Sequence, residues 1–96
     1  MSALETLRVK SSQIHAIAAK HGAGNVRVFG SVARDDARPE SDLDLLIDVV
    51  GPTTPWFPGG LLSDLEDLLG RPVDIVISRS LNPSIRESVL QDSVTL

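Results

Sequence analysis

The sequence contains no cysteine. This excludes disulfide bonds and any zinc or iron–sulfur site built on cysteine ligands, and it is compatible with a reducing compartment. Basic residues are also scarce, because thirteen Asp and Glu outnumber nine Lys and Arg and leave a net charge of −4. A protein that binds a phosphate backbone needs a basic surface, so nucleic acid is not expected as the main partner.

Long apolar runs are missing too. No stretch approaches the ~20 apolar residues that a membrane span requires, and the first residues, "MSALETLRVKSSQ", lack the apolar segment of a signal peptide. We therefore expect a soluble, cytoplasmic protein. A composition of 42% apolar and 23% charged residues is typical of a folded chain, and the 96 residues are enough for one domain spanning residues 1–96.

Hydrophobic periodicity predicts helices at both ends of the chain and strands between them. Ser2 and Glu5 form a capping-box pattern ahead of a helix predicted over about 3–21, and Asn82 before Pro83 predicts the start of a last helix. The segments "NVRVFG", "LDLLIDVV" and "VDIVIS" are typical of strands, and "LLSDLEDLLG" of an amphipathic helix. The predicted fold class is α/β (α+β), a small mixed sheet of about three strands flanked by helices.

Two aspartates stand one residue apart at the start of the second predicted strand. Asp42 and Asp44 should share one face of that strand, where two carboxylates resist ionising together unless a cation lies between them. A helix separates the second and third strands, which is the pattern of two parallel strands joined by a crossover. Asp74, near the start of the third strand, should therefore lie near the other two.

These acids predict a cation site with a phosphate ligand. Carboxylate oxygens suit a hard cation such as Mg²⁺ or Mn²⁺, whose remaining ligands a nucleoside triphosphate can supply. If the first strand runs antiparallel to the second, its end brings Gly30 and Ser31 to the same place. Gly30 would allow close approach to phosphate oxygens, Ser31 would offer donors, and Arg34 would add a cation.

At these residues the chain resembles a known family. Gly30-Ser31, ten further residues and then Asp42-Leu43-Asp44 resemble the signature of the DNA polymerase β-like nucleotidyltransferase superfamily. The segments "VRVFGSVAR", "ARPESDLDLLIDV" and "GRPVDIVI" are similar to its minimal nucleotidyltransferases, one-domain members that are often paired with HEPN-domain toxins in toxin–antitoxin modules.

The resemblance implies a polymerase β-like palm with two Mg²⁺ ions held by Asp42, Asp44 and Asp74. It implies nucleotide binding by Gly30, Ser31 and Arg34. The expected activity is Mg-dependent transfer of AMP from ATP to a hydroxyl, a tyrosine by expectation, of a HEPN-domain toxin that forms a hetero-oligomer with this antitoxin. The chain departs from the family at Asp35 and Asp36, where a glycine usually follows the arginine, and these extra charges oppose polyphosphate binding.

Other interpretations remain open at the level of sequence. The protein could be a catalytically inactive antitoxin that neutralises its toxin by occlusion, whereas an EF-hand calcium loop fits poorly because "DLDLL" is too apolar. Arg34 and Arg38 could be solvated charges or pair with Asp35 and Asp36. Trp56 and Phe57 could pack on the core or form a partner interface. Solvent-facing positions are predicted for Asp48, Asp64, Glu66 and Asp67, and no function is predicted for His15 and His21.

Overall fold

The computed structural model describes residues 2–34 and 42–96. Its elements are, in chain order, the helices and strands α1 (Ala3–Val9), α2 (Ser11–Lys20), β1 (Ala23–Phe29), β2 (Leu43–Val49), α3 (Gly59–Leu69), β3 (Val73–Ile77), the 3₁₀ turn η1 (Ser78–Ser80), α4 (Pro83–Asp92) and β4 (Val94–Thr95). Asp35, Asp36 and Arg38, which the sequence singled out, lie outside the described residues.

The predicted helix starts are confirmed, but the segment predicted as the first helix forms two helices, α1 and α2. The Ser2 hydroxyl accepts a hydrogen bond from the Glu5 backbone N–H at 3.1 Å, and the Asn82 side chain accepts one from the Ser84 backbone N–H at 3.0 Å. The prediction of one helix over 3–21 is wrong because Lys10 leaves helical geometry between α1 and α2. Two serines follow Lys10, and serine side chains compete with the backbone for helical hydrogen bonds.

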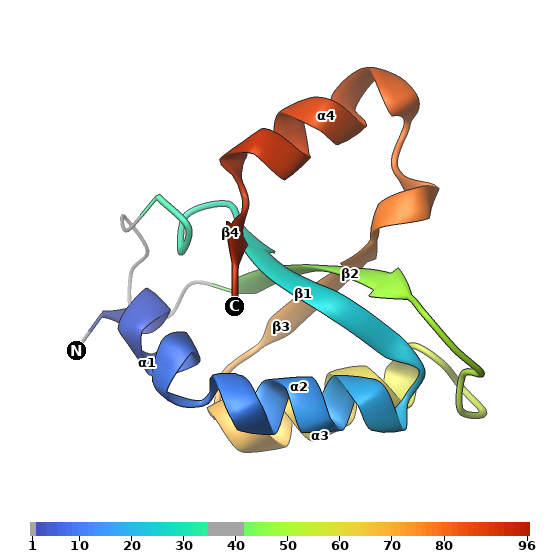
Figure 1. The fold of residues 1–96 in the computed structure, drawn as a ribbon. Helices are drawn as coiled ribbons and strands as arrows, with labels where there is room; N and C mark the ends of the chain where they lie inside the picture. Colours follow the sequence, from blue (N-terminus) through green and yellow to red (C-terminus); the bar gives the residue numbers. More distant parts are fainter. Residues whose placement is uncertain (1, 35–41) are drawn as a thin grey trace.

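The four strands form one mixed sheet in the order β3-β2-β1-β4 (Figure 1). β2 pairs parallel with β3, as the sequence predicted, and β1 pairs antiparallel with β2, which the sequence had left as a condition. The edge strand β4 has two residues and pairs antiparallel with β1. The sequence does not predict β4, since so short a strand leaves no periodic signal.

The two faces of the sheet differ in what covers them. Helices α2 and α3 lie on one face and α4 on the other (Figure 1). The main apolar core lies on the α2 and α3 side, and its strand residues are Val26, Val28, Leu43, Leu45, Ile47 and Val73. Residues of β2 between these positions, among them Asp44, Leu46 and Asp48, therefore point to the opposite side, which we call the outer face.

Three of the residues predicted to face solvent have specific partners instead. Asp48 accepts hydrogen bonds from Asn25 and Arg27 on β1, each at 2.9 Å. The Asp64 carboxylate lies 2.7 Å from Nε2 of His21, and the Glu66 carboxylate accepts a hydrogen bond from the Val73 backbone N–H. These partners come from other elements, so a pattern within one helix or strand could not reveal them.

Trp56 and Phe57 are adjacent in the loop between β2 and α3, but their surroundings differ. Phe57 is half-buried against the core, whereas Trp56 is 90% exposed. The interpretation that these aromatic residues pack on the core is therefore correct for Phe57 and wrong for Trp56. His21, at the end of α2, is buried and hydrogen-bonds the Thr54 hydroxyl at 2.6 Å, which ties this loop to the helix layer. Within the described part of the chain, no helix has the length and apolar character needed to cross a bilayer.

Candidate active site

Asp44 and Asp74 are neighbours across two parallel strands. They are paired positions in the register of β2 and β3, and their own neighbours, Leu43 and Val73, are also paired and buried in the core. Side chains at paired positions of parallel strands share a face, so both acids lie on the outer face. Asp42 lies two residues before Asp44 and is exposed, as is Asp74, while Asp44 is half-buried.

The charges around Asp44 show that these acids act on one another. Burial raises the pKa of the Asp44 carboxyl, and the negative charges of Asp74 and Asp42 raise it further, whereas the positive charge of Arg34 lowers it. A carboxyl that is crowded by two others favours either a proton or a cation. Asp42, Asp74 and Arg34 thus all lie near enough to Asp44 for their charges to act on its pKa.

The end of β1 lies directly against Asp44. Phe29 is paired with Asp44 in the antiparallel register, and Gly30 follows with a φ of +73°. A Cβ atom on Gly30 would overlap Oδ2 of Asp44 and force that carboxylate to shift, and the positive φ also favours glycine here. Ser31 begins the next turn, in which the Arg34 backbone N–H donates to the Gly30 carbonyl at 3.2 Å.

Backbone contacts fix the starts of the two acidic strands. The Leu43 N–H donates to the Pro72 carbonyl at 3.0 Å, and the Val73 N–H donates to Oε2 of Glu66 on α3 at 3.0 Å. Glu66 thus holds the residue immediately before Asp74. Sequence reasoning missed this contact because the hydrophobic spacing of α3 identifies only its apolar face.

The chemistry of the site fits a hard cation, although the side chains are not closed around one. Asp42, Asp44 and Asp74 offer only carboxylate oxygens, the ligand type that Mg²⁺ and Mn²⁺ prefer. Among residues 2–34 and 42–96, no three acidic or histidine side chains stand close enough together to hold a metal ion. Binding a cation would therefore require the exposed Asp42 and Asp74 side chains to move toward Asp44.

Comparison with known proteins decides the family. Residues 11–96 match the family model of the nucleotidyltransferase domain. This chain belongs to that family. It is an enzyme of the nucleotidyltransferase type, and the motif Gly30-Ser31 with Asp42 and Asp44 lies inside the matched region.

Individual relatives agree with this family. The protein adenylyltransferase MntA of Thermococcus cleftensis is 36% identical over 75 residues, which cover 78% of this chain and 76% of the relative. A solved structure assigned as a minimal nucleotidyltransferase is 48% identical, covers 100% of this chain and 97% of that one, and superposes with a TM-score of 0.86.

A third neighbour shares the fold at low identity. It is a crystal structure of a toxin–antitoxin with AMP-PNP, 19% identical, with a TM-score of 0.72 over 88% of this chain and 69% of that one. The predicted family and the predicted mixed α and β fold are thus confirmed.

Proposed function

We propose that this nucleotidyltransferase transfers AMP from ATP to a hydroxyl group of a partner protein. The observation that carries the proposal is the crowding of Asp42, Asp74 and Arg34 around Asp44, with Gly30 directly against its carboxylate. Nucleotidyl transfer needs this combination of acids that can hold a cation and a backbone that admits phosphate oxygens. The relatives named as protein adenylyltransferases support ATP as the donor and a protein as the acceptor.

The proposed site divides into a metal side and a phosphate side. Asp42, Asp44 and Asp74 would hold Mg²⁺, which when bound supplies positive charge to the phosphate oxygens. Gly30 and Ser31 would receive the triphosphate through their backbone and the Ser31 hydroxyl, and the Arg34 guanidinium would balance its charge. Asp74 would also accept the proton of the attacking hydroxyl, since it is the exposed acid at the start of β3.

The proposed reaction is a single displacement at phosphorus. The acceptor hydroxyl oxygen forms a bond to the α-phosphorus of ATP, and the bond from that phosphorus to the bridging oxygen of the β-phosphate breaks. The hydroxyl proton passes to the Asp74 carboxylate, and pyrophosphate leaves. The chain's contribution is mainly positioning and charge stabilisation, which are large terms in phosphoryl chemistry.

We further propose that the acceptor is a tyrosine of a HEPN-domain toxin. A chain of 96 residues leaves little surface with which to enclose a second small substrate, so the acceptor should bring its own structure. One neighbour of the same fold is a toxin–antitoxin with AMP-PNP, which supports a toxin as the partner and an adenine nucleotide as the ligand.

The test incubates this protein with a candidate HEPN-domain partner, ATP and Mg²⁺, and weighs both by intact mass spectrometry. We expect the partner to gain one AMP, to lose its toxicity, and to remain unmodified when EDTA is present. Asp44→Ala should abolish the mass gain.

The matched control is Asp67→Ala, which removes an exposed carboxylate from α3 and should leave transfer unchanged. If the toxin is silenced at unchanged mass, and Asp44→Ala silences it equally well, the protein acts by occlusion and the transfer proposal is wrong. If AMP appears on serine or threonine, the tyrosine assignment alone is wrong.

A further inference from the structure

A second site lies on the same side of the sheet as the acids. It is a cavity of about 380 Å³ between the end of β2 and the chain that joins β3 to α4, lined by Asp48, Val49, Val50, Ser78, Arg79 and Arg86. We call it the outer pocket. Asp48 is four residues from Asp44 along β2, which is about 13 Å. Leu46, between them on the same side, is fully buried, so the pocket is separate from the acid site.

One arginine of the pocket is held in place by backbone carbonyls. Nε of Arg86 donates to the Ser78 carbonyl at 3.2 Å, and Nη2 donates to the carbonyls of Arg79 and Leu81 at 3.1 and 3.0 Å. Nη1 has no hydrogen-bond partner among the described residues, so its two N–H groups remain available. The Arg79 side chain is exposed and likewise has no partner within the described chain.

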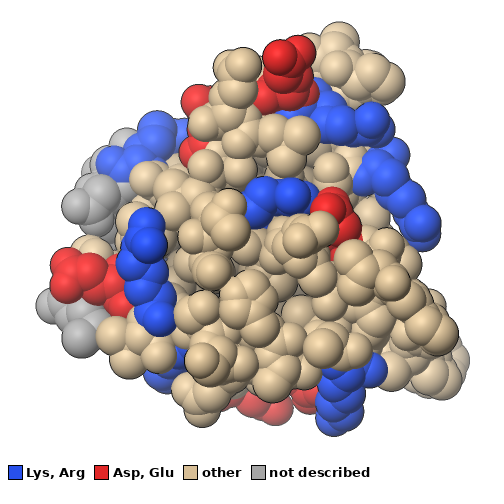
Figure 2. All heavy atoms as spheres, viewed as in Figure 1, with Lys and Arg blue, Asp and Glu red and all other residues tan. Residues whose placement is uncertain are grey.

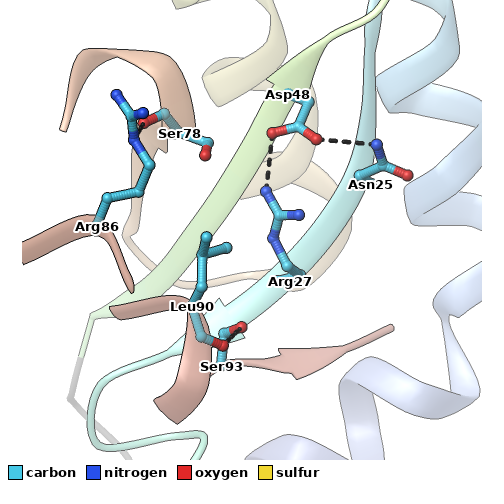
Figure 3. Close-up of polar contacts among 7 residues, drawn as sticks. All are labelled: Asn25, Arg27, Asp48, Ser78, Arg86, Leu90 and Ser93. Carbon is cyan, nitrogen blue, oxygen red and sulfur yellow. Dashed lines mark hydrogen bonds and ion pairs between the residues drawn. The ribbon is translucent and has the colours of Figure 1, made fainter. Parts of the chain in front are cut away.

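The acid in the pocket does not neutralise these arginines. Figure 3 shows the Asp48 carboxylate turned toward Asn25 and Arg27 on β1, across the pocket from Arg86 and Ser78. Burial acts to raise the pKa of Asp48, but the hydrogen bonds from Asn25 and Arg27 and the Arg27 charge outweigh it and lower that pKa. Asp48 therefore stays ionised and paired with Arg27.

The outer pocket is consequently a positive region on an acidic protein. Arg79 and Arg86 add two positive charges beyond the Arg27 and Asp48 pair, in a chain whose net charge is −4. Figure 2 shows basic side chains gathered over η1 and the beginning of α4. The remaining wall is apolar, because Val49 and Val50 close the end of β2 and Val50 is 62% exposed.

We propose that the outer pocket docks an acidic segment of the partner protein. A partner Asp or Glu would accept hydrogen bonds from Arg79 and from Nη1 of Arg86, and an apolar residue beside that acid would cover Val50. Planar guanidinium groups match carboxylates in geometry as well as in charge. This inference rests on the proposed function for the existence of a protein partner, and it names the surface that binds it.

The position of the pocket suits a docking site for the acceptor protein. The pocket lies about 13 Å from Asp44 along β2, and a protein that docks there covers the same side of the sheet as the acids. Binding of the partner protein and transfer of AMP would then depend on different residues. A change in the pocket should alter partner affinity without removing the acids, and a change in the acids should leave docking intact.

The first experiment needs no identified partner. ¹⁵N-labelled protein is titrated with a short peptide containing two glutamates next to a leucine, and with its glutamine twin, while amide chemical shifts are followed by NMR. We expect the glutamate peptide to shift the resonances of Ser78, Arg79 and Arg86, and the glutamine twin to leave them in place. Arg79→Glu should abolish these shifts, whereas the control Arg8→Glu, the same charge change on exposed α1, should retain them.

The second experiment measures binding of a candidate HEPN-domain partner by calorimetry. Arg79→Glu should weaken binding at least tenfold, while Arg8→Glu and Asp44→Ala should bind within twofold of the wild type. Equal binding by Arg79→Glu, or peptide shifts centred away from the pocket, would overturn the proposal. Equal shifts with the glutamate and glutamine peptides would also overturn it. So would a titration in which inorganic phosphate shifts the pocket resonances and the glutamate peptide does not. Loss of AMP transfer with docking intact would overturn only the proposed function.

Discussion

Gly30, just after the end of β1, lies so close to the Asp44 carboxylate at the start of β2 that a Cβ atom on residue 30 would overlap it. Gly30 has a φ of +73°, and a Cβ atom there would overlap Oδ2 of Asp44. Because Gly30 has no Cβ, the Asp44 carboxylate can lie against the backbone at the end of β1. This glycine thus determines how closely β1 approaches Asp44.

Gly30→Ala should therefore impair both stability and nucleotide binding. The left-handed backbone and the overlap with Asp44 should together cost about 1–3 kcal/mol of unfolding free energy, measured by urea denaturation. Gly59→Ala is the matched control, because a Cβ there meets nothing within 4 Å and the residue begins α3. That variant should be neutral or more stable by up to about 1 kcal/mol. Equal stability of the two variants would contradict the contact.

Asp44→Asn should raise the melting temperature in metal-free buffer at neutral pH while it abolishes transfer. Because burial and the charges of Asp74 and Asp42 raise the pKa of Asp44, its ionised form destabilises the folded chain. The gain in melting temperature should shrink as the pH falls through the raised pKa of Asp44. Below that pKa the wild-type carboxyl is protonated and uncharged, as the asparagine side chain is at every pH. Differential scanning fluorimetry across pH 3–8 measures this.

Mg²⁺ should reverse the order of the melting temperatures of the wild type and Asp44→Asn. A cation held by the three acids stabilises the folded state by about 1.4 kcal/mol at ten times its dissociation constant, so the wild type should melt higher with Mg²⁺ and Asp44→Asn should not respond. An equal response of both proteins would place the cation elsewhere.

Asp64→Asn should lower stability at neutral pH and lose that effect in acid. The hydrogen bond from His21 lowers the pKa of Asp64 most, opposed by burial and assisted by the charges of Lys20 and His21. A lowered pKa means that the ionised carboxylate stabilises the fold above about pH 4 and that this contribution disappears as the pH falls below it. Urea midpoints of wild type and variant should converge below pH 4, and a constant gap would show that the ionised form is not responsible.

The two neighbouring aromatic residues should respond differently to truncation. Phe57→Ala should cost about 1–3 kcal/mol, because the ring is half-buried against the core. Trp56→Ala should change stability by less than about 0.5 kcal/mol, because its side chain is 90% exposed. Chemical denaturation distinguishes them, and a large loss from Trp56→Ala would contradict its exposed placement.

Asp35→Gly should tighten binding of the triphosphate, since the change removes a negative charge next in sequence to Arg34 and restores the glycine that the family usually has there. Calorimetry with a non-hydrolysable ATP analogue at low salt measures the change. Asp67→Gly removes the same charge at a distant position and should leave the affinity unchanged. Weaker binding by Asp35→Gly would show that the aspartate assists the site.

The sequence by itself determined the parts of this protein that depend on local spacing. Short apolar runs bounded by Gly, Pro, Asn or Ser predicted β2 and β3, the Ser2 and Asn82 caps predicted helix starts, and the helix between the two strands predicted their parallel pairing. That topology predicted that Asp42, Asp44 and Asp74 can converge at the starts of these strands. An antiparallel first strand, left as a condition, would bring Gly30, Ser31 and Arg34 to the same place.

Only the tertiary structure decided the contacts between distant segments. The close approach of Gly30 to Asp44, the hydrogen bond from the Val73 N–H to Glu66, and the hydrogen bond between His21 and Asp64 join residues that are 14, 7 and 43 positions apart. The outer pocket depends in the same way on how η1 and α4 return over β2, which carries Arg79 and Arg86 toward Asp48. Such contacts follow from loop direction and packing, and no periodicity along the chain encodes them.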